Sequence, residues 1–290
     1  MARILVVGNV TLDIINHVAN YPREDDEVRA LRQERRRGGN AANSAVVLSQ
    51  LGHEVHFAGT LAQEPDAQFI VDDLKRHRIA LDAVQVVAHG KVPTSYVALN
   101  VGNGSRTIVH YRDLPEYAAE PFMRLDLRRF DWIHFEGRNL EAVRTMIEHA
   151  QRTANRLFIS LEAEKPRAGI EALFELPDLL LFSRVYARHH GFDSATALLS
   201  HVHGLHPETR LACGWGARGA YAMESDGRVH FTPAFAPHQV VDTLGAGDVF
   251  NAGMIDGVAR GLALSDALIE AARLAGRKCG QQGFDGLGAP

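Results

Sequence analysis

A glycine-rich segment near the end of the chain combines an open backbone with carboxylates. It has the sequence DTLGAGD over residues 242–248 and precedes a segment of helical character at 249–260. Small residues here let main-chain N–H groups approach an anion, and the N-terminus of a helix favours negative charge. The segment therefore predicts an anion hole, formed by Gly245, Ala246 and Gly247.

Asp248 adds a carboxylate at the same point of the chain. At its ordinary pKa an aspartate is ionised at neutral pH and can accept a proton from a reacting hydroxyl. We interpret Asp248 as a general base beside the anion hole. The alternative is a plain glycine-rich turn whose aspartate only favours the helix dipole.

A second cluster has the sequence GGNAAN over residues 38–43. Asn40 and Asn43 lie one helical turn apart, so both carboxamides can face one cavity, and Asp13 follows the first apolar run. A carboxylate and two amides offer the donors and acceptors that adjacent sugar hydroxyls need. The alternative is that Asn40 caps the helix while Gly39 fits a tight turn.

Short apolar runs alternate with amphipathic segments along the chain. Such runs, when they are apolar throughout, predict a mostly parallel sheet that is flanked by helices on both faces, a Rossmann-like α/β fold. The predicted strands are 4–7, 55–58, 132–135, 157–161, 179–182 and 211–213. The predicted helices are 40–51, 66–77, 140–151, 194–201 and 249–260. Ligands of such sheets bind at the carboxyl ends of the strands.

Two stretches break this alternation and predict a small β-lid formed by about 14–37 and 92–112. The first is polar and charged, and the second alternates around Asn103-Gly104, a strong hairpin signal. We expect both to form antiparallel strands that project from the core. With no repeat or linker, 1–290 is predicted to be a single α/β domain with this lid as an appendage.

Composition excludes several classes of function. The 31 Lys and Arg against 35 Asp and Glu give a net charge of −4, which argues against a nucleic-acid binder. No apolar stretch approaches the roughly 18 residues of a membrane span. Two cysteines form no disulfide framework and favour a cytoplasmic protein. The basic run at 29–37 is interpreted as a solvated lid edge, and the 15 histidines as surface residues, because no third ligand lies at metal-binding spacing.

The two glycine motifs, in this order, resemble those of the ribokinase (PfkB) family of carbohydrate kinases, and the resemblance extends over essentially the whole chain. Further segments are similar to its ketohexokinase (fructokinase) branch, namely 21–25, 104–108, 132–139, 162–167 and 278–286. The resemblance implies a sheet with a β-lid and a homodimer that forms through the lids. It implies ATP, Mg²⁺ and a ketohexose, and the expected reaction is phosphorylation of fructose at its 1-hydroxyl. K⁺ is a further candidate cofactor.

The resemblance also assigns residues by position. Substrate-binding residues would be Asp13, Gly39, Asn40, Asn43, Asp25 and Arg106. Among these, Asp25 would come from the neighbouring subunit's lid, and Arg106 would approach the phosphates. Cleft residues near the phosphates would be Glu136 and Arg138. Residues that contact ATP would be Arg184, Gly216, Gly219 and Cys279, the last three around the adenine.

One segment departs from the family pattern. Most relatives carry Asn-x-x-Glu after the strand that ends near 182, whereas this chain has SRVY at 183–186. No protein ligand for Mg²⁺ is therefore assigned, and the ion is expected to be held mainly by ATP and water. Two alternatives stay open: a PfkB kinase for another ketose, ribose, a nucleoside or a phosphorylated sugar, and a sugar-sensing protein that has lost turnover. A phosphorylated substrate would call for extra cations near Asp13, and none is obvious in the sequence.

Overall fold

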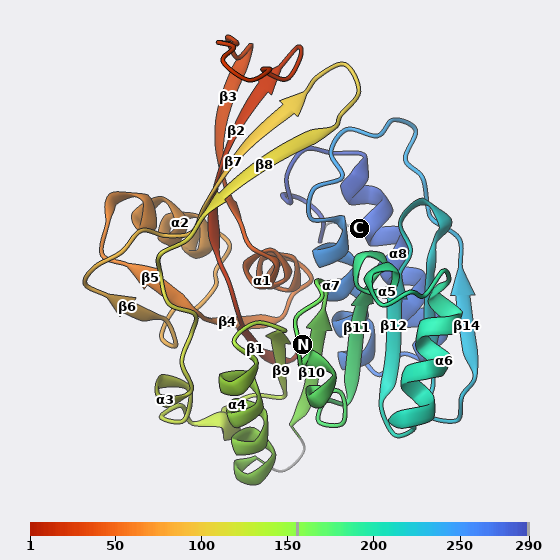
Figure 1. The fold of residues 1–290 in the computed structure, drawn as a ribbon. Helices are drawn as coiled ribbons and strands as arrows, with labels where there is room; N and C mark the ends of the chain where they lie inside the picture. The colour runs from red at the N-terminus through yellow and green to blue at the C-terminus, as the bar shows by residue number, and fades with distance from the viewer. Residues whose placement is uncertain (155–156, 289–290) are drawn as a thin grey trace.

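The computed structural model describes residues 1–154 and 157–288, and its centre is an eight-stranded sheet (Figure 1). The sheet contains, in spatial order, β14 (Val229–Thr232), β13 (Ala220–Met223), β12 (Arg210–Gly214), β11 (Leu179–Ser183), β10 (Phe158–Ala163), β9 (Trp132–Glu136), β1 (Arg3–Val7) and β4 (Glu54–Ala58). In this sheet β4, β1, β9, β10, β11 and β12 run parallel to one another, whereas β13 pairs antiparallel with β12 and β14 antiparallel with β13. The predicted Rossmann-like sheet is confirmed.

Helices cover both faces of this sheet. They are α1 (Asn40–Gln50), α2 (Pro65–Arg76), α3 (Ala119–Phe122), α4 (Leu140–Thr153), α5 (Arg184–His189), α6 (Ala195–Leu205), α7 (Ala246–Ala259) and α8 (Leu264–Cys279), with 3₁₀ turns η1 (Leu127–Arg129), η2 (Ile170–Leu173) and η3 (Gly216–Arg218). Alternate residues of β1 face opposite cores. Ile4 and Val6 pack with α1, α7 and α8, while Leu5 and Val7 pack with α4, α5 and α6. Burial on both faces explains the uninterrupted apolar run.

The lid is a separate four-stranded sheet that rises from the core in Figure 1. Its order is β3 (Arg32–Gly38), β2 (Thr11–Val18), β7 (Thr94–Asn100) and β8 (Arg106–Tyr111). The hairpin around Asn103-Gly104 is present between β7 and β8, with Gly104 at φ 69°. The central pair, β2 and β7, is parallel, so the expectation of antiparallel pairing is wrong at this junction, where both strands enter the lid from the core.

Some elements carry weak signals in the sequence. A small two-stranded sheet, β5 (Thr60–Ala62) and β6 (Gln85–Val87), and the antiparallel pair β13 and β14 were not predicted. Helix α8 was also missed, because no side chain caps its N-terminus at Ala263 and the apolar stripe alone marks it. Helix α7 begins at residue 246 rather than 249, because Gly245 forms its N-cap at φ 78°.

The histidines are not all surface residues. His134 is fully buried on β9, where its Nδ1 lies 2.9 Å from the Ser160 hydroxyl and burial lowers its pKa to about 4. His53 is also buried, with Nε2 2.9 Å from Asp256. Within residues 1–154 and 157–288, no group of three or more His, Cys, Asp and Glu side chains could hold a metal ion, and no helix is long and apolar enough to cross a membrane.

Close packing against α8 fixes the position of α7, whose N-terminus follows the glycine-rich segment at 242–248. Helix α7 presents Gly253 and Gly257 to α8, one helical turn apart. A Cβ at Gly253 would lie 2.7 Å from the Ala271 Cα, and one at Gly257 would lie 2.6 Å from the Ala267 Cβ. Because backbone atoms occupy this space, the two helices can approach only where side chains are absent.

This seam predicts that Gly253→Ala destabilises the protein although alanine is the better helix former. Overpacking of this kind costs about 1–3 kcal/mol. The same substitution at Gly204, which is exposed in α6 and has open space around its missing Cβ, should instead stabilise by up to about 1 kcal/mol. Urea denaturation of both variants measures the difference. Equal effects on the free energy of unfolding would contradict the packing.

Candidate active site

A cavity of about 950 Å³ lies between the carboxyl ends of the parallel strands and the lid. Residues of both glycine motifs, the lid and the late helices line it together. From the predicted site residues, the lining includes Asp13, Gly39, Asn40, Asn43, Arg106, Glu136, Arg138, Gly216, Gly219, Gly245, Ala246, Gly247, Asp248 and Cys279. The fold thus brings together residues that are as many as 266 positions apart, from 13 to 279.

Two predicted site residues lie outside this lining. Arg184 starts α5 just behind the cavity wall, where a Cβ on Gly216 would lie 3.3 Å from its Nη1. Asp25 is exposed in the irregular segment between β2 and β3, with φ 64°. Its predicted contact is with a neighbouring subunit's sugar site, so its role stays a prediction.

Asp248 sits in the first turn of α7 and is 6% exposed. Its Oδ2 accepts a hydrogen bond of 2.6 Å from the Asn43 Nδ2. The preceding turn requires glycine at 245, because φ is 78° and a Cβ there would lie 2.4 Å from the Phe284 ring. The turn thereby places the Asp248 carboxylate at a helix N-terminus, beside backbone that an anion can approach.

The amides of the second motif have partners that the sequence did not reveal. Asn40 Nδ2 donates to the Glu164 carboxylate at 3.0 Å, and the N-cap of α1 is Gly39, at φ 95° with no side-chain cap. The capping interpretation of Asn40 is therefore wrong. Asn43 bridges two charged groups, since its Oδ1 accepts from the Arg37 Nη1 at 2.5 Å while its Nδ2 donates to Asp248.

Carboxylates crowd this side of the cavity. Glu162, which follows the same strand-end rule but was not predicted as a site residue, is 4% exposed and accepts from the Asn251 Nδ2 at 2.9 Å. Glu136 accepts the Asn9 N–H at 2.8 Å. Burial raises the pKa of both Glu136 and Glu162, the latter strongly. The position of Glu162 at the carboxyl end of β10 was the signal that could have found it.

Burial also dominates the electrostatics of Asp248. It raises the pKa of this carboxyl to about 8, and the neighbouring Glu164 and Glu136 charges act in the same direction. The hydrogen bond from Asn43 and the charge of Arg37 act against them and favour the ionised form. A carboxyl with a pKa in this range can both accept and release a proton near neutral pH.

Arg37 corrects the interpretation of the basic run as a solvated edge. It is buried, and its Nε donates to Asp73 of α2 at 2.7 Å. Arg36 is also largely covered and pairs with Asp242 at 3.0 Å, whereas Arg32 and Arg35 are exposed. The carboxylate partners of Arg37 and Arg36, Asp73 and Asp242, come from distant elements that the sequence does not place beside this end of β3.

Cations near Asp13 were also missed. Asp13 is 9% exposed and accepts from the Thr11 hydroxyl at 3.0 Å, and burial raises its pKa. The charge of Arg37 opposes that rise, and His110 acts in the same direction when its ring is protonated. His110 lines the cavity, whereas Arg37 lies behind it. The environment of Asp13 is therefore more basic than the sequence indicated.

Asp242, at the start of the DTLGAGD segment, has a structural partner. Its Oδ2 lies 3.1 Å from the Nζ of Lys278, a lysine with no exposed surface, and its Oδ1 accepts the Leu244 N–H at 2.9 Å. These contacts brace the turn before Gly245. Cys279 is half-buried and burial raises its pKa, as expected of a packing residue rather than a reactive thiol.

The opposite end of the cavity fits a flat, mostly apolar group such as adenine. Its walls there are small side chains and backbone, from Gly216, Ala217, Ala272, Ala275, Gly276 and Cys279. Between this end and Asp248 lie the backbone of Gly245 and Gly247, and a Cβ on Gly247 would meet open space. The Ala246 N–H donates to the Thr243 carbonyl at 3.3 Å, so Gly245 and Gly247 carry the better placed donors of the predicted anion hole.

Known proteins are similar to this chain in sequence and in fold. The model of the pfkB family of carbohydrate kinases matches residues 1–286. Ketohexokinase from Mus musculus is 41% identical to the chain over 98% of both proteins. The solved ribokinase from Giardia lamblia superimposes with a TM-score of 0.83 at 16% identity, over 99% of this chain and 95% of that one. Ribokinase from Arabidopsis thaliana, solved with ribose and ATP, gives 0.81 at 19% identity, over 97% and 94%.

Proposed function

This chain belongs to the pfkB family and is an ATP-dependent carbohydrate kinase, and we propose that its acceptor is a ketohexose, fructose, which it converts to fructose 1-phosphate. The observation that carries the proposal is the position of Asp248. Its buried carboxylate lies at the N-terminus of α7, between the anion-hole backbone and the polar cluster of Asp13 and Asn40. The 41% identity to mouse ketohexokinase supports the choice of a ketohexose.

In the proposed reaction, Asp248 orients the sugar hydroxyl and accepts its proton. The hydroxyl oxygen forms a bond to the γ-phosphorus of ATP while the bond from that phosphorus to the bridging oxygen breaks, and ADP leaves. Donors at Gly245 and Gly247 and the guanidinium groups of Arg106 and Arg138 would offset the negative charge of the transferring group. Proton acceptance contributes ~10²–10⁴-fold in such reactions, and positioning contributes the rest.

Family members use ATP and Mg²⁺, and both fit the cavity. The adenine would lie between η3 and α8, with Arg184 behind Gly216 and near the phosphates. Mg²⁺ supplies charge neutralisation when bound, and we propose that it is held mainly through the phosphates and water. K⁺ remains a candidate without a named ligand. The two cysteines, which are free, suit the reducing cytoplasm that we propose as its location.

We also propose that two copies associate through their lids. Apolar side chains are exposed on the lid at Tyr96, Val101, Ile108, Val109 and Tyr111, with Val109 at 66%. Such an exposed patch is typical of an interaction surface, and lid pairing would bring Asp25 to the partner's sugar site. Sedimentation velocity should give the mass of a dimer, which Val109→Glu should reduce to that of a monomer. A monomeric wild-type protein would contradict the proposal.

The proposed substrate is tested by measuring ADP release with a panel of ketoses, aldoses, nucleosides and sugar phosphates. We expect the highest kcat/KM with fructose and phosphorylation of its 1-hydroxyl, read by NMR of the product. Faster turnover of ribose or a nucleoside would favour another family substrate. Tight sugar binding without ADP release would favour a sensor, and both results would contradict the proposal.

The pH dependence tests the role of Asp248. The base acts only when ionised, so kcat/KM should fall as pH drops through its pKa, which burial raises to about 8. We expect a midpoint well above the value of about 3.9 of an ordinary aspartate. Asp248→Asn should fold, lose at least ~10²-fold in kcat and lose this acid limb. A variant with near-normal turnover would exclude Asp248 as the base.

A further inference from the structure

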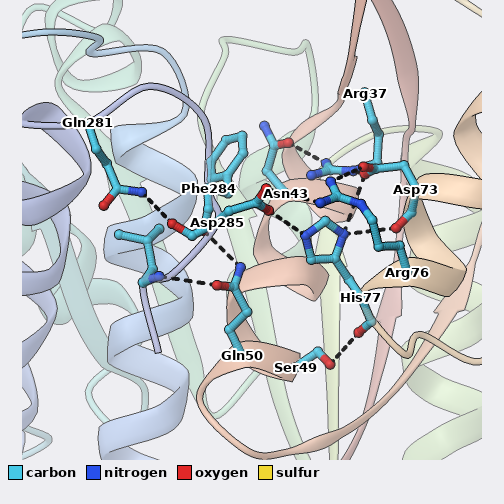
Figure 2. Close-up of polar contacts among 11 residues, drawn as sticks. Arg37, Asn43, Ser49, Gln50, Asp73, Arg76, His77, Gln281, Phe284 and Asp285 are labelled. Carbon is cyan, nitrogen blue, oxygen red and sulfur yellow. Dashed lines mark hydrogen bonds and ion pairs between the residues drawn. The ribbon is translucent and has the colours of Figure 1, made fainter. Parts of the chain in front are cut away.

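Arg37 makes no contact with the cavity, yet it is the buried charge behind the proposed base. It is 7% exposed, and its Nη1 donates to the Asn43 Oδ1 at 2.5 Å. The Nδ2 of the same amide donates to Asp248 at 2.6 Å. A guanidinium, an amide and a carboxylate thus form one chain from β3 through α1 to α7. Figure 2 shows the first half of this chain, with Arg37 between Asn43 and Asp73.

The chain fixes the orientation of the amide. A guanidinium carries only donors, so the group that faces Arg37 must be the carbonyl oxygen of Asn43. Its NH₂ group must then face Asp248, where it can only donate. A donor at this position stabilises the ionised carboxylate over the neutral acid. If Arg37 were absent, the amide could turn, and its oxygen could accept a hydrogen bond from the neutral carboxyl of Asp248 instead.

Arg37 is itself held from several sides. The Asp73 carboxylate accepts a hydrogen bond from the Arg37 Nε and also pairs with Arg76 at 2.7 Å. Arg76 and His77 in turn contact Asp285 near the end of the chain, at 3.0 and 2.8 Å. Figure 2 shows these side chains converging from α2 and the C-terminal segment. This network fixes the guanidinium without using any group of the cavity.

The C-terminal segment closes the enclosure around Arg37. The Phe284 ring lies against the guanidinium, with 5.6 Å from the Arg37 Cζ to the ring centroid. Gln50 of α1 anchors this segment, since its Nε2 donates to the Phe284 carbonyl at 2.8 Å and its Oε1 accepts the Leu287 N–H at 3.1 Å (Figure 2). The ring also contacts the turn at Gly245, so the same side chain shapes the anion hole.

The charges around Asp248 make this cation significant. The acidic groups that act on Asp248 and Arg37 from neighbouring elements include Glu136, Glu162, Glu164, Asp13 and Asp73. The basic Arg76 and His77 pair with Asp73, whereas the acidic groups nearest Asp248 disfavour its ionisation. Arg37 opposes them with its own charge and with the orientation that it imposes on Asn43.

We propose that Arg37 is a positioning residue, which fixes the Asn43 amide as a donor to Asp248 and so keeps this base able to ionise near neutral pH. The proposal rests on the proposed role of Asp248. Loss of the Arg37 guanidinium should raise the pKa of Asp248 and move the acid limb of the kcat/KM profile to higher pH. An opposite charge nearby typically lowers the pKa of a carboxyl by roughly 1 unit or more. Removing that charge should therefore lower kcat/KM on the acid limb by roughly tenfold for each pH unit that the limb moves.

The test compares Arg37→Met with a matched control on the same strand. Arg35 also pairs with an aspartate of α2, Asp66 at 2.5 Å, and its Cζ also lies over an aromatic ring, 5.0 Å from the centroid of Phe69. It does not contact Asn43. We expect Arg37→Met to move the acid limb upward and to lower kcat/KM at pH 7 at least about tenfold, with recovery at higher pH. Arg35→Met should leave the acid limb where it is in the wild type. Arg37→Lys, which keeps a positive charge, should displace the limb less than Arg37→Met does.

Two further variants separate positioning from loss of structure. Asp73→Asn keeps Arg37, its bond to Asn43 and a side-chain oxygen that can still accept the Arg37 Nε–H, so the acid limb of this variant should stay near that of the wild type. In a double-mutant cycle with Asn43→Ala, the effect of Arg37→Met should largely vanish, because both act through one amide. If Arg37→Met does not fold, Arg37→Met/Asp73→Asn, which leaves no buried unpaired charge, is compared with Asp73→Asn in its place.

The proposal would be overturned if the acid limb of kcat/KM in Arg37→Met coincided with that of the wild type. An equal displacement in Asp73→Asn, or additive effects of Arg37→Met and Asn43→Ala, would also overturn it. Failure of the proposed function looks different, because the wild type would then release no ADP, or Asp248→Asn would keep its activity and acid limb.

Discussion

In the proposed reaction, the site depends on one constraint, a buried carboxylate that must ionise. Asp248 is removed from water, and burial together with neighbouring acids raises its pKa to about 8. Neither burial nor the acids can be dispensed with, since a phosphoryl-transfer site needs to exclude water and to hold several polar groups. Two groups oppose this rise: the Asn43 amide donates a hydrogen bond to one oxygen of the carboxylate, and Arg37 donates to the oxygen of that amide.

The fold supplies these groups from distant segments of the chain. Parallel strands end at one edge of the sheet, so Glu136 and Glu162 reach the same cavity from neighbouring strands. Helix α7 directs its N-terminus to this edge, and its glycine seam against α8 fixes its position. The lid brings Arg106 and His110 over the opening. The site is thus a consequence of topology, with the chemistry placed at element ends.

Local patterns predicted the parts of the molecule that depend on local chemistry. Apolar runs gave the parallel strands, and the DTLGAGD segment gave the start of α7 to within three residues, because a helix N-terminus and its glycines leave a signature within a few residues. Pairings between distant residues left no such signature. Burial of Arg37 depends on Asp73 of α2, and the partners of Asn40 and Asn43 lie just after β10 and on α7. The parallel pairing of β2 with β7 was likewise invisible in either strand alone.

The ionisation of Asp248 can be observed directly, without turnover. Carbon-13 labelling of the aspartate carboxyls, with Asp248→Asn to assign the signal, would report its titration by NMR in the ligand-free protein. The account predicts a midpoint far above that of an ordinary aspartate, near the value of about 8 that burial produces, and a further upward shift when Arg37 is replaced. A signal that remains ionised down to about pH 4, the ordinary aspartate pKa, would contradict the central claim.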